Sequence, residues 1–315
     1  MVRYGAPPYL AVRDRLERGR TVVLDGGLGS ELVRRGIRWR DHALRTDAAA
    51  VQALHAEYLR AGAHVIRTNT FQLNRRIYQN VFRDAAHLHH IGAPDLDQRI
   101  PTLIPRAVHL AQLARDEVGS SDVAIAGVMS PLEHCFRPDL APSDAQAQAE
   151  HAEIAQLLAG AGVDLLLLES MNSLGEAGVA LAAALETGLP VWVSFVVGAD
   201  GNLLSDESLA VATRTARAAG VEATLVNCAP PDDIDRALIV MDQASPWPGA
   251  YAHIGRFDPP SWKFEFFPRF TYTDGWTPAR YSAMAADWRT RGARILGGCC
   301  GTGPAHVRTL AEMVA

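Results

Sequence analysis

The sequence predicts an α/β protein, a (β/α)8 barrel built as a single domain over residues 1–315. Short apolar runs alternate with stretches of helical spacing along the whole chain. Several of these runs carry almost no polar residue, as expected for parallel strands that are covered on both faces. Eight strand–helix units in 315 residues fit a closed barrel better than a doubly wound sheet.

The short apolar runs define the eight expected strands. They lie at Thr21–Leu24, His64–Arg67, Val123–Val128, Asp164–Leu168, Val191–Val197, Ala223–Val226, Ala250–Ala252 and Ala293–Leu296. Helical spacing predicts helices that include Ala48–Leu59, Leu103–Asp116, Ala145–Leu158, Ser208–Ala218 and Arg280–Trp288. A glycine precedes five of the strands, as expected where a helix ends in a left-handed residue. These are Gly62, Gly162, Gly188, Gly220 and Gly292. Residues 1–18 are expected to form an N-terminal extension with a helix.

The glycines after the first expected strand do not indicate a dinucleotide-binding fold. Gly26, Gly27 and Gly29 lack the spacing of that fingerprint. The longest connections are residues 84–101 and 254–276, and we expect both to be irregular. Long loops on a barrel are usually functional or interfacial.

Composition excludes several classes of function. The chain has 30 Lys and Arg against 35 Asp and Glu, a net charge of −5, which argues against a nucleic-acid partner. Four cysteines are too few for a disulfide scaffold, so we expect a cytoplasmic protein. The N-terminus has no apolar segment of signal-peptide length. The most apolar window, Val179–Val197, contains Glu186 and is broken at Gly188 and Pro190, so we expect no membrane span.

Three cysteines follow expected strands at the barrel end where chemistry takes place. Cys228 follows the sixth strand, and Cys299 and Cys300 follow the eighth. Three thiolates suit Zn²⁺ and leave a fourth coordination position open for a substrate. The alternative is a set of buried apolar cysteines without function. Cys135, after the third strand, is expected to be inert packing, and the other interpretations are an alternative ligand or a redox thiol.

The adjacent pair of cysteines needs a special backbone. Neighbouring side chains on a regular strand point to opposite faces, so Cys299 and Cys300 could not both bind one ion there. Gly297, Gly298 and Gly301 surround the pair, and we expect them to supply the unusual backbone angles that turn both thiols inward.

An open site of three thiolates favours one reaction class. Zinc held by three thiolates carries net negative charge and activates water poorly. It is better suited to binding a fourth thiol and keeping it deprotonated at neutral pH. We therefore expect alkyl transfer to a thiol substrate from an electrophilic methyl donor held in line.

Five segments together resemble the homocysteine S-methyltransferase family. They are LDGGLGSEL near the start, TNTFQ, LLLLES, the NC pair at 227–228, and GGCCGTGPAHV near the end. The resemblance runs from about Thr21 to Leu310. It implies a zinc-dependent (β/α)8 barrel that methylates L-homocysteine to methionine, with Cys228, Cys299 and Cys300 as the zinc ligands.

The resemblance also implies residues that bind the amino-acid substrate. Asp25, with the backbone of Gly26 and Gly27, matches the family's amino-acid-binding motif, where N–H groups would hold the substrate carboxylate. Glu169 matches the acidic residue expected to bind the substrate ammonium. A carboxylate after four leucines is costly without a partner. The alternatives are that Asp25 caps a turn and that Glu169 pairs with Arg67.

Four further polar residues are candidates for the site. Asn69 and Thr70 either line the donor pocket or make local hydrogen bonds. Asn227 could orient a zinc thiolate from behind. His253 stands where the family usually has an asparagine. It binds a substrate carboxylate, or it changes donor choice, or it is a neutral, hydrogen-bonded packing residue.

Two positions in the sequence indicate the class of methyl donor. Relatives that use betaine place a tyrosine after the glutamate and another after the second strand, where this chain has Ser170 and Gln72. The resemblance therefore favours a sulfonium donor such as S-methylmethionine or S-adenosylmethionine. Alternatives are another thiol or selenol acceptor, another onium donor (dimethylsulfoniopropionate or betaine), and a non-catalytic zinc- or thiol-binding barrel. A homo-oligomer is left open.

The connection at 254–276 contains eight of the 22 aromatic residues of the chain. They are Phe257, Trp262, Phe264, Phe266, Phe267, Phe270, Tyr272 and Trp276. Packing or a subunit interface is the favoured interpretation, and a cage for a cationic sulfonium is the alternative. The loop histidines His87, His89 and His90 are expected to be solvated rather than metal-binding.

Overall fold

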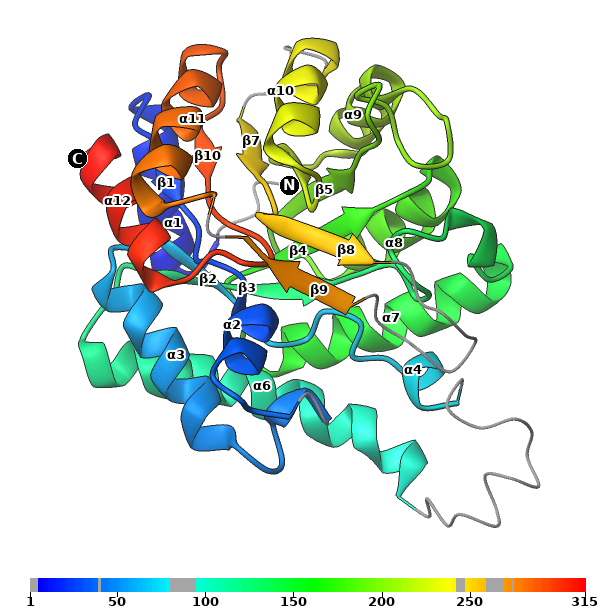
Figure 1. Cartoon of the computed structure of the whole chain (residues 1–315). Helices are drawn as coiled ribbons and strands as arrows, with labels where there is room; N and C mark the ends of the chain where they lie inside the picture. Colours follow the sequence, from blue (N-terminus) through cyan, green and yellow to red (C-terminus); the bar gives the residue numbers. More distant parts are fainter. Residues whose placement is uncertain (1–4, 39–40, 80–94, 242–246, 259–268, 274) are drawn as a thin grey trace.

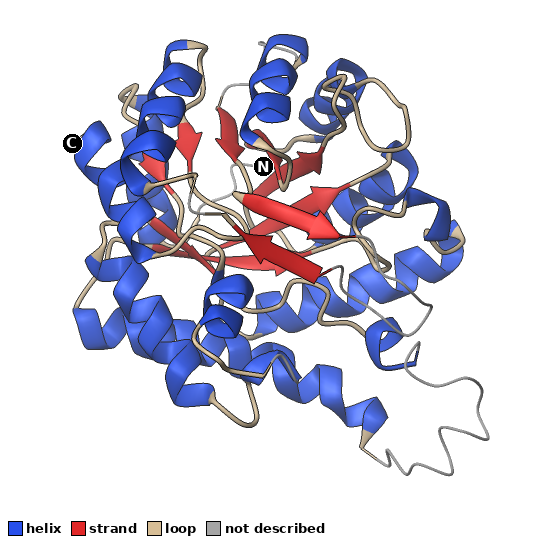
Figure 2. Ribbon diagram, in the orientation of Figure 1, coloured by secondary structure: helices blue, strands red, loops and turns tan. Residues whose placement is uncertain are grey.

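The computed structural model describes residues 5–38, 41–79, 95–241, 247–258, 269–273 and 275–315. Eight parallel strands form a sheet in the order β1-β10-β7-β6-β5-β4-β3-β2. A parallel bridge between Leu24 and Val65 joins the two ends of this sheet, so the strands close into a barrel. Helices surround the strands (Figure 1 and Figure 2). The predicted (β/α)8 barrel is therefore confirmed.

The barrel strands occupy the eight expected positions. Their bounds are β1 Val22–Val23, β2 Val65–Arg67, β3 Ala124–Met129, β4 Leu165–Met171, β5 Val191–Val196, β6 Ala223–Asn227, β7 Pro248–Tyr251 and β10 Ile295–Leu296. β1 and β10 are two residues long, shorter than expected, since β1 loses one residue at each end and β10 begins two residues later than expected.

Each predicted helix is present. Four agree with their expected bounds within two residues, and the helix expected to begin at Leu103 begins at Leu96. The α-helices are α1 Pro7–Glu17, α2 Leu28–Arg34, α3 Ala48–Arg60, α4 Arg75–Gln79, α6 Leu96–Val118, α7 Asp144–Gly160, α8 Leu174–Glu186, α9 Leu209–Ala219, α10 Pro231–Val240, α11 Pro278–Thr290 and α12 Pro304–Val314. All five glycines expected before strands have positive φ, from 78° at Gly188 to 108° at Gly292. Among the described residues, the helices are all too short or too polar to span a bilayer.

Two apolar layers follow from the alternation of side chains along the strands. On β4, Leu165 and Leu167 belong to the cluster inside the barrel. Their neighbours Leu166 and Leu168 belong to the larger cluster between the strands and the surrounding helices. A strand buried on both faces explains the uninterrupted run of leucines.

Helix α1 closes the N-terminal end of the barrel. Tyr9, Val12 and Leu16 join the interior cluster. The Tyr9 hydroxyl donates to Glu222 Oε2 at 2.7 Å and accepts from Trp192 Nε1 at 3.1 Å. This end is therefore filled by apolar side chains, and the polar groups of the barrel interior lie at the opposite, C-terminal end.

The connection expected to be irregular at 84–101 is partly helical. Helix α6 begins at Leu96, although Pro101 and Pro105 lie inside it. Buried Ile100 and Ile104 anchor this first part of the helix in the core. Tertiary burial thus outweighs the helix-breaking tendency of proline. The histidines at 87, 89 and 90 lie outside the described residues.

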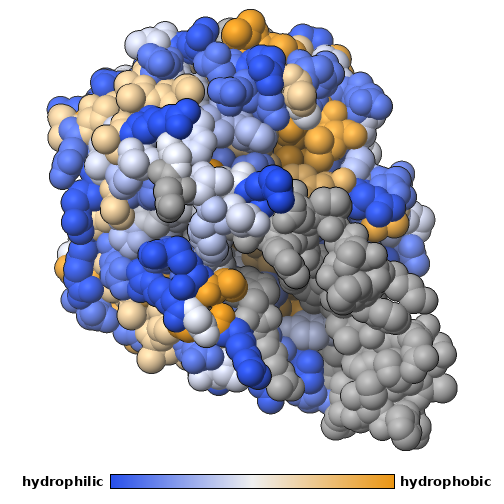
Figure 3. Space-filling view, in the orientation of Figure 1, coloured by the Kyte–Doolittle hydropathy of each residue, from blue (hydrophilic) through white to orange (hydrophobic). Residues whose placement is uncertain are grey.

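The connection expected to be irregular at 254–276 contains an antiparallel hairpin. Strand β8, Gly255–Asp258, pairs with β9, Arg269–Tyr272. Pairing satisfies backbone groups that a long loop would otherwise leave to solvent. The hairpin lies in front of the barrel strands in Figure 1. In the coloured part of the hydropathy view, hydrophilic residues predominate and hydrophobic residues form separate groups (Figure 3).

Candidate metal and substrate site

The three predicted metal-binding cysteines meet at the C-terminal end of the barrel. The sulfurs of Cys228, Cys299 and Cys300 all lie within 4.8 Å of one another. Cys228 directly follows β6, and the pair follows β10. Cys228 and Cys299 are buried, and Cys300 is partly exposed. The fold thus brings together three thiols that are separated by 71 residues in sequence.

The backbone angles that gather the thiols differ in part from the expectation. Cys228 itself has a left-handed φ of 52°, and Gly301 has a φ of 88°. Gly297 and Gly298 do not have positive φ. They are needed for close approach, because a Cβ on Gly298 would lie 2.1 Å from Thr302 Oγ1 and one on Gly297 would lie 2.6 Å from Leu24 Cβ.

Hydrogen bonds from neighbouring segments fix the cysteine backbones. Cys299 N donates to Ala252 O at 3.0 Å, and Ile254 N donates to Cys300 O at 2.9 Å. The amide of Cys228 donates to Tyr251 O at 3.3 Å. The chain after β7 therefore lies between the two cysteine segments and holds them in register.

Proximity and burial raise the pKa of all three thiols in the absence of a metal. The pKa of Cys228 is raised by its hydrogen bonds with Cys135 and Cys299 and by burial. The pKa of Cys300 is raised by the hydrogen bond of Cys300 with Cys228 and by burial. For Cys299, the hydrogen bond with Cys228 lowers the pKa, but the hydrogen bond with Cys300 and burial outweigh it. Such thiols become thiolates when a cation compensates their charge.

Arg67, at the end of β2, connects the carboxylates of the site. Its Nε donates to Asp25 Oδ1 and its Nη1 donates to Glu169 Oε1, each at 2.6 Å. Its Nη2 donates to the carbonyl of Gly298 at 2.7 Å, one residue before the cysteine pair. The guanidinium also lies 4.9 Å from the centre of the Tyr251 ring. One buried cation thus joins the expected amino-acid pocket to the cysteine cluster.

The charges of this group do not cancel. Two carboxylates, Asp25 and Glu169, face one guanidinium, that of Arg67. Arg67 uses only Oε1 of Glu169, and Oε2 has no hydrogen bond to any described residue. The group therefore carries a net charge of −1 at the barrel mouth when both carboxylates are ionised, which favours a cation beside Glu169.

Asp25 does not face the open mouth. Its side chain is fully buried, and both oxygens accept hydrogen bonds from Arg67, one from the backbone N–H and one from Nε. Burial raises the pKa of Asp25, and the charge of Arg67 opposes this shift. The amide of Gly27 is also engaged, because it donates to Thr302 O at 3.0 Å. The amide of Gly26 makes no hydrogen bond to the described residues.

Asn69 and Thr70 make local hydrogen bonds. Asn69 Nδ2 donates to His42 O at 2.7 Å, and Thr70 Oγ1 donates to Val128 O at 2.8 Å. Both side chains are buried. Gln72, two residues on, has a φ of 55° and its Nε2 donates to Glu133 O at 2.9 Å. These bonds tie the loop after β2 to the segment before α3, to β3 and to the loop after β3.

Asn227 forms a buried chain of polar side chains across three strands. Ser194 Oγ donates to Asn227 Oδ1 at 2.5 Å, and Asn227 Nδ2 donates to Ser170 Oγ at 2.7 Å. Ser170 has a left-handed φ of 62°. Positive φ values at Ser170 and Cys228 place strained backbone at the ends of β4 and β6, on either side of β5, and functional sites concentrate such strain.

His253 is a buried neutral histidine that contacts the backbone of a cysteine. Its ring hydrogen bonds to the carbonyl of Cys228, and burial lowers its pKa to about 4. Its amide donates to Ala229 O at 3.1 Å. The structure therefore places His253 behind Cys228, where it supports the turn that follows β6.

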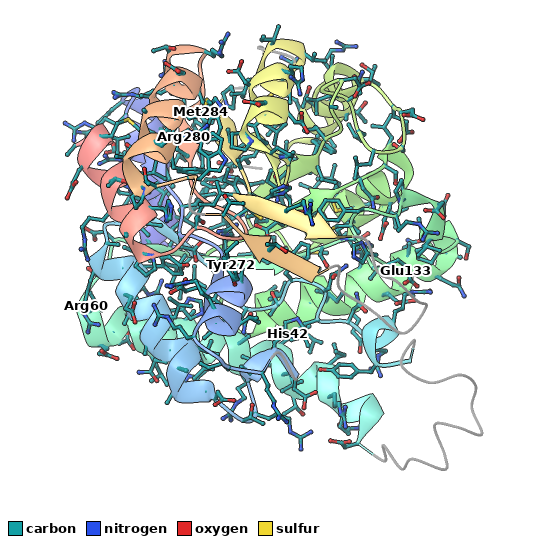
Figure 4. The ribbon with its side chains drawn as sticks, viewed as in Figure 1. His42, Arg60, Glu133, Tyr272, Arg280 and Met284 are labelled. Atoms are coloured by element: carbon teal, nitrogen blue, oxygen red, sulfur yellow. The ribbon has the colours of Figure 1, made fainter. Side chains whose placement is uncertain are left out.

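The aromatic connection approaches the site through Tyr272. The Tyr272 hydroxyl donates to the carbonyl of Ser30 on α2, and Ser30 Oγ accepts from Gly301 N at 3.0 Å. Figure 4 shows Tyr272 at the end of β9 nearest α2. Trp276 instead stacks with Arg280, whose guanidinium lies 4.1 Å from the ring centre. Phe257 and Phe270 belong to β8 and β9, and the other four aromatic residues lie outside the described residues.

The sequence analysis named Arg67 only as an ion-pair partner that would occupy Glu169 in place of the substrate. It did not identify Thr302 or Ser30 as residues of the site. Arg67 was detectable as a charge at the end of an apolar strand. Thr302 Oγ1 donates to Cys299 O at 2.6 Å and accepts from Gly27 N. Nothing in the sequence marks such a role, because Thr302 and Gly27 are joined only by closure of the barrel.

Comparisons with known proteins identify relatives of this chain. The profile of the Homocysteine S-methyltransferase family matches residues 22–314. "Betaine--homocysteine S-methyltransferase 1" of Xenopus laevis is 26% identical over 96% of this chain and 75% of that protein. "S-methylmethionine--homocysteine S-methyltransferase BHMT2" of Pongo abelii is also 26% identical, over 96% and 81%. "Homocysteine S-methyltransferase 4" of Zea mays is 28% identical over 95% and 90%.

Solved structures share the fold. The metallated form of the homocysteine methyltransferase MmuM from Escherichia coli superposes with a TM-score of 0.75 at 22% identity, covering 96% of this chain and 99% of that one. Its oxidized form gives a TM-score of 0.74 over 98% and 99%, also at 22% identity. The relatives include users of betaine and of S-methylmethionine at similar identity, so the donor must be argued from the site.

Proposed function

This chain belongs to the homocysteine S-methyltransferase family, and we propose that it transfers a methyl group from a sulfonium donor to the thiol of L-homocysteine, using Zn²⁺. The observation that carries the proposal is a juxtaposition. Three thiols lie beside a buried Arg67–Glu169 pair at one end of the barrel. A thiol-bearing amino acid needs both features, one for its sulfur and one for its ammonium group.

The cysteine cluster fits zinc. Zinc–sulfur bonds of about 2.3 Å keep two ligating sulfurs within about 4.6 Å of each other, close to the 4.8 Å limit that the three thiols satisfy. Thiolates are soft ligands that suit zinc, and three of them leave one position for a substrate. When bound, zinc supplies a charge that keeps the substrate thiol deprotonated at neutral pH. Cys228, Cys299 and Cys300 would hold it.

Glu169 is assigned to the substrate ammonium group. Its Oε2 has no hydrogen bond to any described residue, and its group with Asp25 and Arg67 carries a net charge of −1 when both carboxylates are ionised. An ammonium group at Oε2 would neutralise that charge and form a charge-assisted hydrogen bond. Asp25 has no direct contact with the substrate in this proposal and instead holds Arg67 in position, since both carboxylate oxygens of Asp25 accept hydrogen bonds from Arg67.

The backbone after β1 is assigned to the substrate carboxylate. The Gly26 amide makes no hydrogen bond to the described residues, so it is the donor we propose. Gly27 contributes by its lack of a side chain, because a Cβ there would lie 2.4 Å from Cys299 O. Both glycines therefore remain in the proposed substrate site, with different roles.

Asn69, Thr70, Asn227 and His253 are assigned as supports for the loops that carry the site. Each makes a buried hydrogen bond to backbone or to a neighbouring strand. We assign His253 to support the backbone of Cys228, in place of the direct contact with substrate that the sequence left open. Their substitution is expected to affect zinc retention and substrate affinity through the positions of these loops.

A sulfonium donor suits a site without an acid–base pair. Methyl transfer from a sulfonium to a thiolate needs no general base, and the leaving group is a neutral thioether. The positions where betaine users carry tyrosines hold Gln72 and Ser170, which are bonded to Glu133 and Asn227. Neither offers an aromatic face for a quaternary ammonium.

The test is methionine formation by reduced, zinc-loaded protein with homocysteine and four donors in parallel: S-methylmethionine, S-adenosylmethionine, dimethylsulfoniopropionate and betaine. Product from sulfonium donors alone supports the proposal. Product from betaine alone overturns the donor assignment. Zinc binding without product from any donor moves the acceptor to another thiol or selenol, or favours a non-catalytic zinc-binding barrel.

A further inference from the structure

A fourth cysteine, Cys135, adjoins the three-cysteine cluster. Cys135 lies in the loop after β3 and is 5% exposed. Its side chain hydrogen bonds with that of Cys228, and it lies close enough to Cys300 to contribute to the raised pKa of that thiol. The four cysteines of the chain therefore gather at one end of the barrel. Three follow β6 and β10 and are the assigned ligands, and the fourth follows β3.

Contacts on both sides hold the loop that carries Cys135. The carbonyl of Cys135 accepts from Asn172 Nδ2 at 3.1 Å. The amide of Leu132 donates to Glu176 Oε1 at 2.7 Å. Phe136 packs against the interior cluster that contains Cys228 and Cys299. The thiol is thus presented to the cluster by a fixed segment.

We propose that Cys135 is the fourth zinc ligand of the substrate-free enzyme and that the thiol of homocysteine takes its place. The inference rests on the proposed function of the site. Zinc in proteins takes four ligands, and a neighbouring thiol is a better ligand for it than solvent oxygen. Closure by Cys135 would also keep solvent from the metal until a substrate arrives.

The position of Cys135 suits a ligand that can leave. It does not belong to the set of sulfurs that all lie within 4.8 Å of one another. Ligation by Cys135 therefore requires its side chain to shift toward the other three sulfurs, on a segment that is otherwise held in place. That movement opposes binding and makes the fourth bond weaker than the other three.

The exchange conserves protons. The bond between the metal and the Cys135 thiolate breaks, and the bond to the homocysteine sulfur forms. The proton of the incoming thiol passes to the departing Cys135 thiolate, which leaves as a neutral thiol. No proton reaches the buffer. If Cys135 takes no part, the thiol proton of homocysteine is released to solvent.

The first readout is the number of sulfur ligands. X-ray absorption at the zinc edge is measured on reduced, zinc-loaded, substrate-free wild type, Cys135→Ser and Cys135→Ala. Four sulfurs are expected for wild type, and three with one lighter atom for both variants. After homocysteine is added, all three proteins are expected to show four. Wild type with three sulfurs before homocysteine overturns the inference.

The second readout is proton release, from calorimetric titrations of homocysteine in two buffers of different ionisation enthalpy. Wild type is expected to release about none and Cys135→Ser about one proton per site. Equal release by both proteins contradicts the exchange. If wild type retains zinc and forms methionine but gives the contrary result in these tests, only the role of Cys135 is overturned. Wild type that binds no zinc overturns the metal proposal as well.

Discussion

Arg67 Nη1 lies 2.6 Å from Glu169 Oε1, and the same guanidinium donates to Asp25 and to the carbonyl of Gly298. One side chain thus links β2 to β4, to the turn after β1 and to the segment before the cysteine pair. Because the pair is buried and its hydrogen bonds are short, its members are expected to move together.

Glu169→Gln should weaken homocysteine binding by about tenfold to hundredfold, the cost of losing a charged hydrogen bond. Zinc content should stay at the wild-type level, because Glu169 is not among the three cysteines assigned to the metal. Calorimetric titration with homocysteine and metal analysis measure the two quantities. Unchanged affinity would show that the ammonium group binds elsewhere.

Cys228→Ser should abolish methyl transfer and lower the zinc content, because it removes one of three thiolates. Metal analysis and methionine formation check this on the same preparation. Glu169→Gln is the control for metal content, since it leaves all four cysteines of the chain in place and is expected to keep the zinc content of wild type. Normal turnover by Cys228→Ser would exclude the proposed metal site.

Arg67→Met should lower the free energy of unfolding by about 3–5 kcal/mol, because it leaves two buried carboxylates without their cation. Adding Asp25→Asn should recover part of that loss. Urea unfolding of wild type, both single variants and the double variant gives the coupling energy. Additive effects of the two substitutions would show that the pair is not coupled.

Gly27→Ala should reduce zinc retention, because its Cβ would lie 2.4 Å from the carbonyl oxygen of Cys299 and would displace that backbone. Gly175→Ala is the matched control on α8, where nothing lies within 4 Å of the added Cβ. It should stabilise the protein by about 0.5–1 kcal/mol. Competition with a zinc-binding dye measures the first effect and thermal unfolding the second. Equal zinc retention in the two variants would contradict the proposed contact.

Stability should fall as the pH drops from about 6.5 toward 4, in part through His55. Burial lowers its pKa to about 4, so the unfolded chain binds a proton in this window and the folded protein does not. The loss amounts to up to about 3 kcal/mol for this residue.

His55→Leu tests this pH dependence, because neither ring nitrogen of His55 has a hydrogen-bond partner among the described residues. The variant should unfold at a higher temperature than wild type, with the larger gain at pH 5. His151→Leu is the control and should destabilise, since His151 bonds Glu176 at 3.2 Å. A gain that does not depend on pH would rule out protonation of His55 as the cause.

The barrel and the cysteine cluster were predictable because their signals are local. Apolar runs such as Leu165–Leu168 and glycines such as Gly62 report strands and helix ends within a few residues. Strand order then places Cys228 and Cys299 at one end. The expectation that residues 84–101 and 254–276 are irregular was wrong. Burial decided the early start of α6, and strand pairing decided the hairpin of β8 and β9.

The sequence by itself determined the eight-fold alternation, the positions of the strands and the set of thiols at one end of the barrel. Only the tertiary structure decided how the charges pair and which backbone groups remain open. Arg67 engages both oxygens of Asp25 and one of Glu169, and the Gly27 amide is taken by Thr302. These partners are 42 to 275 residues apart. Contacts of that range depend on how the closed barrel positions strand ends, which no local pattern encodes.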